Sequence, residues 1–238
     1  MESRAAGELL PRVITPGPKL DGGSFIRSLL NWSNHGHRIL TSPADARRAV
    51  AALKAQGVDF IKVHNRLTPA LYEAIIAECR KERLPFAGHL PTAGPLAAAA
   101  AGQRTIEHGR GMLLCSPATW AQIRSDPNAQ TGQEYCAPTA VQSEMLPALV
   151  HAGTWLTPTL TSWRGHAMIG DPALTRWIDS LPGSSAIWPA LRRHWDDMTE
   201  STPTAFERQL LGQFGTLAAA ASRAGVLNGH WLARPGGE

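Results

Sequence analysis

Apolar and polar residues follow two alternating patterns between residues 42 and 109. Short β-branched apolar runs, typical of buried strands, are separated by longer segments in which apolar residues recur every three or four positions, as in helices. The strand-like runs are 58–64, 84–90 and 104–109. A repeated order of strand, helix and strand predicts parallel βαβ units, which close into a barrel or form a doubly wound sheet.

Clear signals mark the ends of the predicted helices. Ser42 supplies a capping hydroxyl, Pro43 suits the first helical position, and Asp45 places a carboxylate at the third. Thr68-Pro69 opens a second helix in the same way, and a third covers about 93–101. Glycine follows the first and third of these helices, at 57 and 102, where a left-handed residue commonly ends a helix.

The pattern is less regular outside this region. The apolar run 11–15 predicts a short strand, and the stretch 17–41, rich in Gly, Ser, Asn and His, predicts a loop. Residues 139–152 and 203–224 have helical periodicity, whereas 154–160 is typical of a strand. Between these last two segments, about 161–202, many Trp and Pro residues indicate an irregular helical insertion.

Composition restricts the class of protein. Of 238 residues, 43% are hydrophobic and 18% charged, a balance typical of a globular chain. The formal net charge of +4 comes from scattered basic residues without a Lys/Arg block, so we expect no nucleic-acid binding. There is no apolar run long enough for a membrane span and no apolar signal-peptide core near the start. We therefore expect no membrane association and, by default, a cytoplasmic location.

The chain has three cysteines, Cys79, Cys115 and Cys136. Their number is odd and none has C-x-x-C spacing, so the sequence predicts three free thiols and neither a disulfide framework nor a zinc knuckle.

Three polar residues lie late in three successive apolar strands: Lys62, His89 and His108. Buried parallel strands are normally apolar throughout, and a buried charge needs a partner or a function. Taken singly, each histidine could be a hydrogen-bonded core residue and Lys62 could extend to the rim of the sheet. Three such residues in consecutive strands favour a site, because barrel enzymes build theirs at the carboxyl ends of the strands.

The motifs around these residues resemble the central part of the amidohydrolase superfamily, in particular its imidazolonepropionase-like and Xaa-Pro dipeptidase-like members. The matching motifs are D-F-I-K at 59–62, G-H at 88–89 and I-E-H-G at 106–109. Two less specific matches are P-G-P-K-L-D-G-G at 16–23 and W-L-T-P-T at 155–159. The resemblance covers roughly residues 11 to 226.

This resemblance implies an α/β fold: a partial (β/α)8 TIM barrel with parallel strands, forming one incomplete domain over 1–238 that lacks its first strands and its last. It also implies a divalent metal, zinc, as one or two ions. Lys62, carboxylated by carbon dioxide, would bridge the ions, and His89 and His108 would be further ligands. The implied activity is hydrolysis, by metal-activated water, of carbon–nitrogen bonds in cyclic amides or dipeptide-like small molecules. The oligomeric state is unknown.

The sequence departs from the family at both ends of the match. The family's first-strand H-x-H pair has no counterpart in place. His35 and His37 have that spacing but lie in the predicted loop, so we do not assign them to a metal. The stretch 225–230 corresponds to the G-T-D motif with the catalytic aspartate, yet no Asp follows Asp197, and His230 cannot be assigned as a replacement. The catalytic residue is thus unknown.

These departures leave an alternative function open. The chain could be a catalytically inactive, truncated remnant, which predicts weak zinc binding and little hydrolysis. A binding module has little support from motifs.

The sequence also predicts which way two neighbours of the predicted ligands, His64 and Glu107, face. His64 should share a side of its strand with Lys62, where it would line the substrate pocket or hydrogen-bond at the rim. Glu107 should face the opposite side from His108, toward the helices, where an ion pair is expected.

Overall fold

The computed structural model describes residues 13–23, 36–116, 118, 121, 135–168, 171–184 and 205–229. The chain divides into two compact units, Met1–Ala93 and Gly94–Glu238, named here the first and the second unit. In the described part of the chain, no helix is both long enough and apolar enough to cross a membrane.

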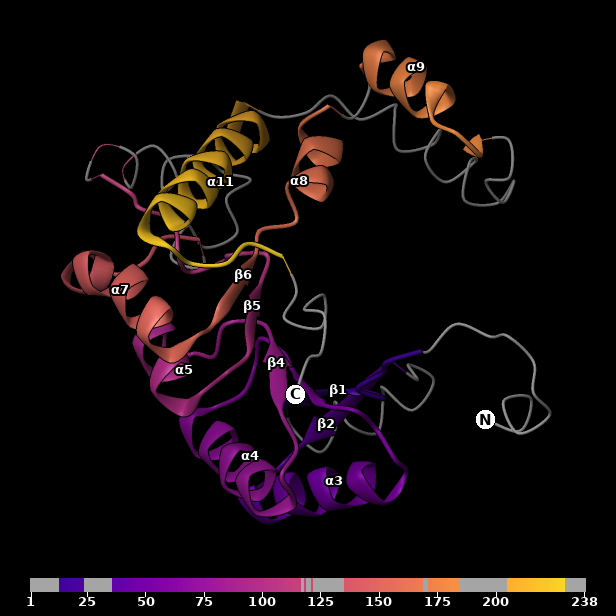
Figure 1. Ribbon diagram of the computed structural model, residues 1–238, viewed down its shortest axis with the longest axis vertical. Helices are drawn as coiled ribbons and strands as arrows, with labels where there is room; N and C mark the ends of the chain where they lie inside the picture. The colour runs from indigo at the N-terminus through magenta and orange to yellow at the C-terminus, as the bar shows by residue number, and fades with distance from the viewer. Residues whose placement is uncertain are drawn as a thin grey trace. The chain divides into compact units, whose positions relative to one another are not determined.

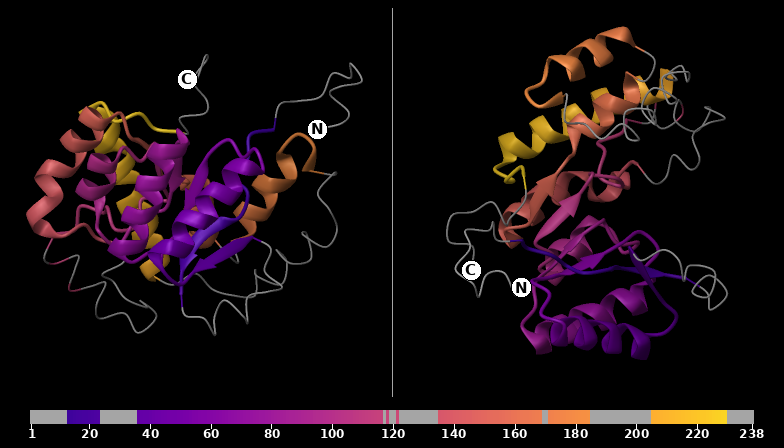
Figure 2. Two further views of the ribbon diagram at one scale, coloured as in Figure 1. Left: turned by 90° about the horizontal axis from the view of Figure 1, so that it is seen from below. Right: turned by 90° about the vertical axis from the view of Figure 1, so that its right-hand side faces the viewer.

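The first unit is a parallel sheet with helices on one face. Its strands follow the order β2-β1-β3-β4, and every pairing between them is parallel. Figures 1 and 2 show the helices α3 and α4 of this unit side by side along the strands. The elements are β1 (Lys19–Gly22), β2 (His37–Leu40), α3 (Pro43–Ala55), β3 (Ile61–Val63), α4 (Pro69–Glu82) and β4 (Phe86–Gly88).

Side chains alternate between the two faces of these strands. Leu20, Ile61 and Val63 are fully buried in the core, whereas Lys62 and His64 are only half-buried. The helices start as predicted: Ser42 Oγ accepts a hydrogen bond from the Asp45 amide, and Thr68 caps α4 in the same way. The predicted helices and the strands β3 and β4 are therefore confirmed in this unit.

The first two strands contradict the sequence prediction. The described residues 13–17 form no strand, and Lys19–Gly22 and His37–Leu40 are strands where a loop was expected. Thr15 is still held near the start of β3, since Thr15 O accepts from the amide of Asp59, two positions before that strand, at 3.0 Å. The prediction was wrong because it required apolar strands, whereas β1 and β2 place polar side chains on one face.

The second unit pairs β5 (Thr105–Glu107) with β6 (Trp155–Thr157), also in parallel. Asn228 forms an isolated parallel bridge with Leu156, so the stretch 226–229 continues the sheet beside β6. α8 and α7 both contact α11, and α5 contacts α7. The remaining elements are α5 (Pro95–Ala101), η2 (Thr139–Val141), α7 (Gln142–Ala152), α8 (Leu160–Ala167), α9 (Pro172–Ser180) and α11 (Ala205–Ala224).

The parallel α/β fold class is thus confirmed, including the strand predicted at 154–160 and the helix ending at Gly225. Of the predicted insertion at 161–202, the structure describes α8 and α9, while 169–170 and 185–202 lie outside the described residues. The prediction of a single domain stays a prediction.

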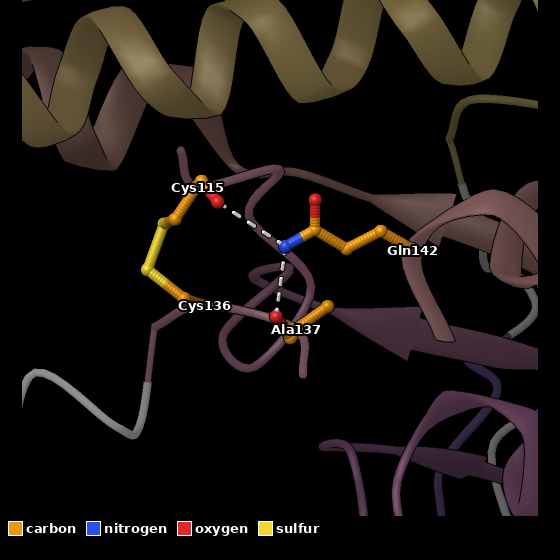
Figure 3. Close-up of a disulfide and its surroundings, with 4 residues drawn as sticks. All are labelled: Cys115, Cys136, Ala137 and Gln142. Atoms are coloured by element: carbon orange, nitrogen blue, oxygen red, sulfur yellow. Dashed lines mark hydrogen bonds between the residues drawn. A yellow bond between two sulfur atoms is a disulfide. The ribbon is translucent and has the colours of Figure 1, made fainter. Parts of the chain in front are cut away.

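The prediction of three free thiols is wrong for two of them. Cys115 and Cys136 form a disulfide with Cα atoms 5.6 Å apart. Gln142 Nε2 donates to the carbonyls of Cys115 and Ala137, which holds the cross-linked segments together (Figure 3). The pairing depends on the parallel bridge between Leu113 and Cys136, a long-range contact with no spacing motif. Cys79, on α4, is free and buried.

Candidate functional site

Lys62, His64 and His89 lie on one face of the first unit, at the carboxyl ends of β3 and β4. Lys62 is in register with Ala87, and the His89 amide donates to Val63 O at 3.0 Å. Since neighbouring residues in a parallel pair face the same side, the register sets His89 beside His64. Their ring centroids are 4.3 Å apart and tilted by 36°.

A glycine allows this close approach. Gly88 has φ +135°, and a Cβ at this position would lie 2.3 Å from Val63 O. No other residue fits there without moving β4 away from β3. Gly88 therefore places His89 directly next to His64.

A hydrogen bond defines the orientation of the His89 ring. Its Nδ1 is bonded to Asn65 Oδ1. With the amide oxygen as acceptor, Nδ1 holds the ring proton and Nε2 is the nitrogen with the lone pair. Metal-binding histidines are commonly oriented in this way, by an oxygen acceptor on the other ring nitrogen.

His108, in the second unit, is positioned by irregular backbone. β5 ends at Glu107, and His108 follows with φ +65° in the left-handed region. Its amide donates to Thr157 O at 2.7 Å, and its Nδ1 lies 3.0 Å from Thr159 Oγ1. Thr159 also has a positive φ, +49°. Such conformations cost free energy in non-glycine residues and are concentrated at functional sites.

Glu107 does not face away from His108, contrary to the sequence prediction. Its Oε2 lies 3.9 Å from His108 Nε2, and the side chain is buried. The expectation assumed continued strand alternation, but the left-handed backbone at His108 ends that alternation. Glu107 therefore contacts the predicted ligand itself.

A second polar group in the first unit joins Asp21, His37 and His64. Asp21 Oδ1 accepts from the backbone amides of Gly22 and Arg66, at 3.0 and 2.8 Å. Its Oδ2 lies 3.2 Å from His64 Nδ1 and 3.9 Å from His37 Nδ1. Asp21 and His37 lie on the two strands that the sequence analysis read as a loop. The alternation of Lys19, Leu20 and Asp21 was the available signal.

The charges in this group shift two pKa values. Burial raises the pKa of Asp21, but the approach of His64 and the amides of Arg66 and Gly22 outweigh it, so the pKa lies below 3.8. Burial, with the nearby charge of Lys19 and the approach of His64, lowers the pKa of His37 and outweighs the opposite effect of Asp21. The carboxylate is therefore ionised and His37 neutral near pH 7.

Other sequence candidates are not brought into these groups. His35 and His230 lie outside the described residues. Asn228 lies on the stretch that pairs with β6, where the family motif would place the catalytic aspartate. None of the described residues 226–229 has a carboxylate side chain.

A pocket of about 520 Å³ opens at the carboxyl ends of β1 and β2. The side chains and loops around it come from those strands and from the starts of α3 and α4. Its lining includes Gly22, Leu40, Ser42, Arg66 and Thr68.

No protein-family model and no curated protein matches this chain. Among solved structures, bottromycin amidohydrolase is similar at 22% identity and a TM-score of 0.56, over 95% of this chain and 47% of that one. A Xaa-Pro dipeptidase with bound methionine gives 15% identity and a TM-score of 0.52, over 95% and 49%. A prolidase complexed with N-methylphosphonate-L-proline gives 16% and 0.53, over 96% and 50%.

The chain thus spans about half the length of the solved structures it matches. Their names describe enzymes that act on amide or peptide bonds. Identities this low establish a shared fold only. The parallel α/β chain has the fold of amidohydrolase-like enzymes.

Proposed function

We propose that this chain is a metal-dependent hydrolase of the amidohydrolase type, with Lys62, His89 and His108 among its metal ligands. Its substrates would be cyclic amides or dipeptide-like small molecules. One observation is the main support: both predicted ligand histidines have Nδ1 bonded to a side-chain oxygen, from Asn65 and from Thr159. This leaves Nε2 as the ligand nitrogen in each ring.

The residues present fit a zinc ion or a related transition metal. Imidazole nitrogen is a preferred zinc ligand, and a carboxylated Lys62, as the family resemblance implies, would add an anionic oxygen. Such a metal lowers the pKa of bound water to about 7 and polarises a substrate carbonyl.

The chain's own residues orient the ligands. Asn65 fixes the tautomer of His89, and Thr159 orients the ring of His108. His64 packs its ring against His89 and restricts its rotation. The pocket beside Arg66 offers space for a small molecule at the same ends of the strands.

A second candidate, an inactive protein, is favoured by one observation. The stretch beside β6 has Asn228 and no carboxylate among residues 226–229. An amide cannot accept the proton of an attacking water, and general-base catalysis contributes roughly 10²–10⁴-fold. We therefore propose that turnover by this chain is low even with zinc bound.

Zinc stoichiometry and hydrolysis, measured on the same purified chain, test both candidates. Elemental analysis would count bound zinc, and hydrolysis of N-acyl amino acids and X-Pro dipeptides would be assayed with and without zinc. His89→Ala and His108→Ala should lose zinc, whereas His151→Ala, at an exposed position on α7, should not. Zinc-dependent turnover would reject the inactive candidate. Unchanged zinc content in both ligand variants would reject the metal assignment.

A further inference from the structure

Asp21, His37 and His64 form a compact group that the family resemblance does not explain. One ligand atom from each residue lies within 4.8 Å of the others. All three side chains are largely shielded from water, with exposed fractions of 2% for Asp21, 19% for His37 and 17% for His64. They come from three neighbouring strands of the first unit, β1 and β2 and the end of β3.

Hydrogen bonds to one oxygen fix the orientation of the Asp21 carboxylate. Two backbone amides donate to Asp21 Oδ1, so Oδ2 faces the two imidazoles. Ligating carboxylates in metal sites are typically fixed by such hydrogen bonds to the oxygen that does not bind the metal.

The spacing of the atoms suits a shared cation. In a tetrahedral zinc site with bonds of about 2.0–2.1 Å, neighbouring ligand atoms lie about 3.3 Å apart. Asp21 Oδ2 and His64 Nδ1 are already 3.2 Å apart. His37 Nδ1, at 3.9 Å from Oδ2, needs only a small side-chain rotation to reach the same spacing.

One nitrogen in the group contacts only the carboxylate. His64 Nδ1 is buried and lies 3.2 Å from Asp21 Oδ2, but this contact does not have the geometry of a hydrogen bond. A bound ion shared by the two atoms would account for a close contact of this kind. This nitrogen points to the same Oδ2 that His37 approaches.

We propose that Asp21, His37 and His64 bind a divalent transition-metal ion at a site separate from the ligand set proposed above. Two imidazole nitrogens and one carboxylate oxygen are a donor set used for zinc and for non-haem iron(II). Three protein ligands leave at least one coordination position for water or a small molecule. His37, set aside in the sequence analysis, is thereby a ligand.

The ring nitrogen that binds distinguishes the two sites. At this site the ligand atoms are Nδ1 of His37 and His64, whereas His89 and His108 would bind through Nε2. Long-range ¹H–¹⁵N spectra of the imidazoles, recorded while zinc is added to the full chain, resolve the two ring nitrogens. Zinc should shift Nδ1 of His37 and His64, both in the original chain and in a variant with His89→Ala and His108→Ala.

Asp21→Asn is the matched variant, because its amide oxygen can still accept from the two backbone amides while the negative charge is lost. We expect zinc binding at this site to weaken at least tenfold, as seen by calorimetry. Since a buried position could affect folding, His37→Ala, at the start of β2, is the second variant and should weaken binding similarly; circular dichroism checks both. His151→Ala should bind like the original chain.

Three results would overturn the proposal: no zinc binding by the original chain, zinc saturation without shifts at His37 and His64, or equal affinity in Asp21→Asn and His37→Ala. If the His89→Ala and His108→Ala variants bound less zinc but zinc still shifted Nδ1 of His37 and His64, the site at Asp21, His37 and His64 would stand. Failure of the proposed function and failure of this site therefore give different results.

Discussion

The two units position their predicted ligand histidines by different means. In the first unit, His89 follows a regular strand, and the register of β3 with β4 places it beside His64. In the second unit, His108 sits on left-handed backbone and is held by Thr159, itself at positive φ. A position set by strand register can be read from a period of two, whereas one set by irregular backbone depends on particular long-range contacts.

The units also differ in what stabilises them. In the described part of the first unit, α3 and α4 pack on the sheet and the cysteine is free. The second unit has a disulfide. Changes confined to one unit should therefore have unequal effects on the two. Hydrogen exchange measured by mass spectrometry on the full chain reports each unit separately.

The largest effect is expected from Gly88→Ala. The new Cβ would lie 2.3 Å from Val63 O at a residue with φ +135°, so both overpacking and backbone strain oppose folding. Together they should cost roughly 3–5 kcal/mol. Exchange should accelerate across the first unit. Gly212→Ala, on α11 with open space around it, is the control and should be neutral or slightly stabilising.

Removing the disulfide should destabilise the second unit. Cys115→Ser with Cys136→Ser frees a loop whose ends are 21 positions apart, which costs about 3 kcal/mol in chain entropy. Denaturant unfolding with and without reductant measures this loss in the original chain. If the reductant accelerated exchange in the first unit as much as in the second, the separation of the two units would be wrong.

Asp21→Ala tests how much the Asp21 carboxylate stabilises the first unit. The change leaves the amides of Gly22 and Arg66 without their acceptor and should cost about 2 kcal/mol. Asp21→Asn should cost less, because its oxygen still accepts.

The same residue makes stability depend on pH. The pKa of Asp21 in the folded chain lies below its ordinary value of 3.8, so the ionised form favours folding. Its contribution is present above pH 3.8 and is lost as the pH falls through the lower folded-state pKa. The difference in unfolding free energy between the original chain and Asp21→Asn should shrink across that acidic range. A constant difference would contradict the shift.

The smallest effects should come from the residues that orient the ligand histidines. Asn65→Ala and Thr159→Val each remove the oxygen bonded to Nδ1 and should weaken zinc binding about tenfold, equivalent to about 1.4 kcal/mol. Thr216→Val, which removes a hydroxyl on α11, is the matched control. Because His108 also depends on left-handed backbone, Thr159→Val should have the larger effect of the two in calorimetric titration.

The fold was predictable wherever one rule applied along a whole segment. The strands β3 to β6 and the helix ends at Ser42 and Gly57 followed from apolar runs and capping residues. β1 and β2 were missed because Asp21 and His37 interrupt their apolar character. The polar face that hid these strands is the one that holds the Asp21 group, and local rules commonly fail at such sites.

The candidate site was predictable only in part. Lys62, His89 and His108 were predicted as ligands because a polar residue in a buried apolar strand needs a partner or a function, and that assignment stays a prediction. The contact of Glu107 with His108 and the Cys115–Cys136 pairing were not, since each depends on chain geometry with no sequence spacing. The cytoplasmic location stays a prediction.

The buried thiol of Cys79 can be used to measure how often the first unit opens. Burial raises the pKa of Cys79 to about 12, so the thiol is protonated and unreactive at neutral pH while α4 stays packed. The other two cysteines, Cys115 and Cys136, are bonded to each other. In the oxidised chain, the rate of alkylation by iodoacetamide, followed as a single mass increment, would therefore record how often the first unit opens, without any signal from the second.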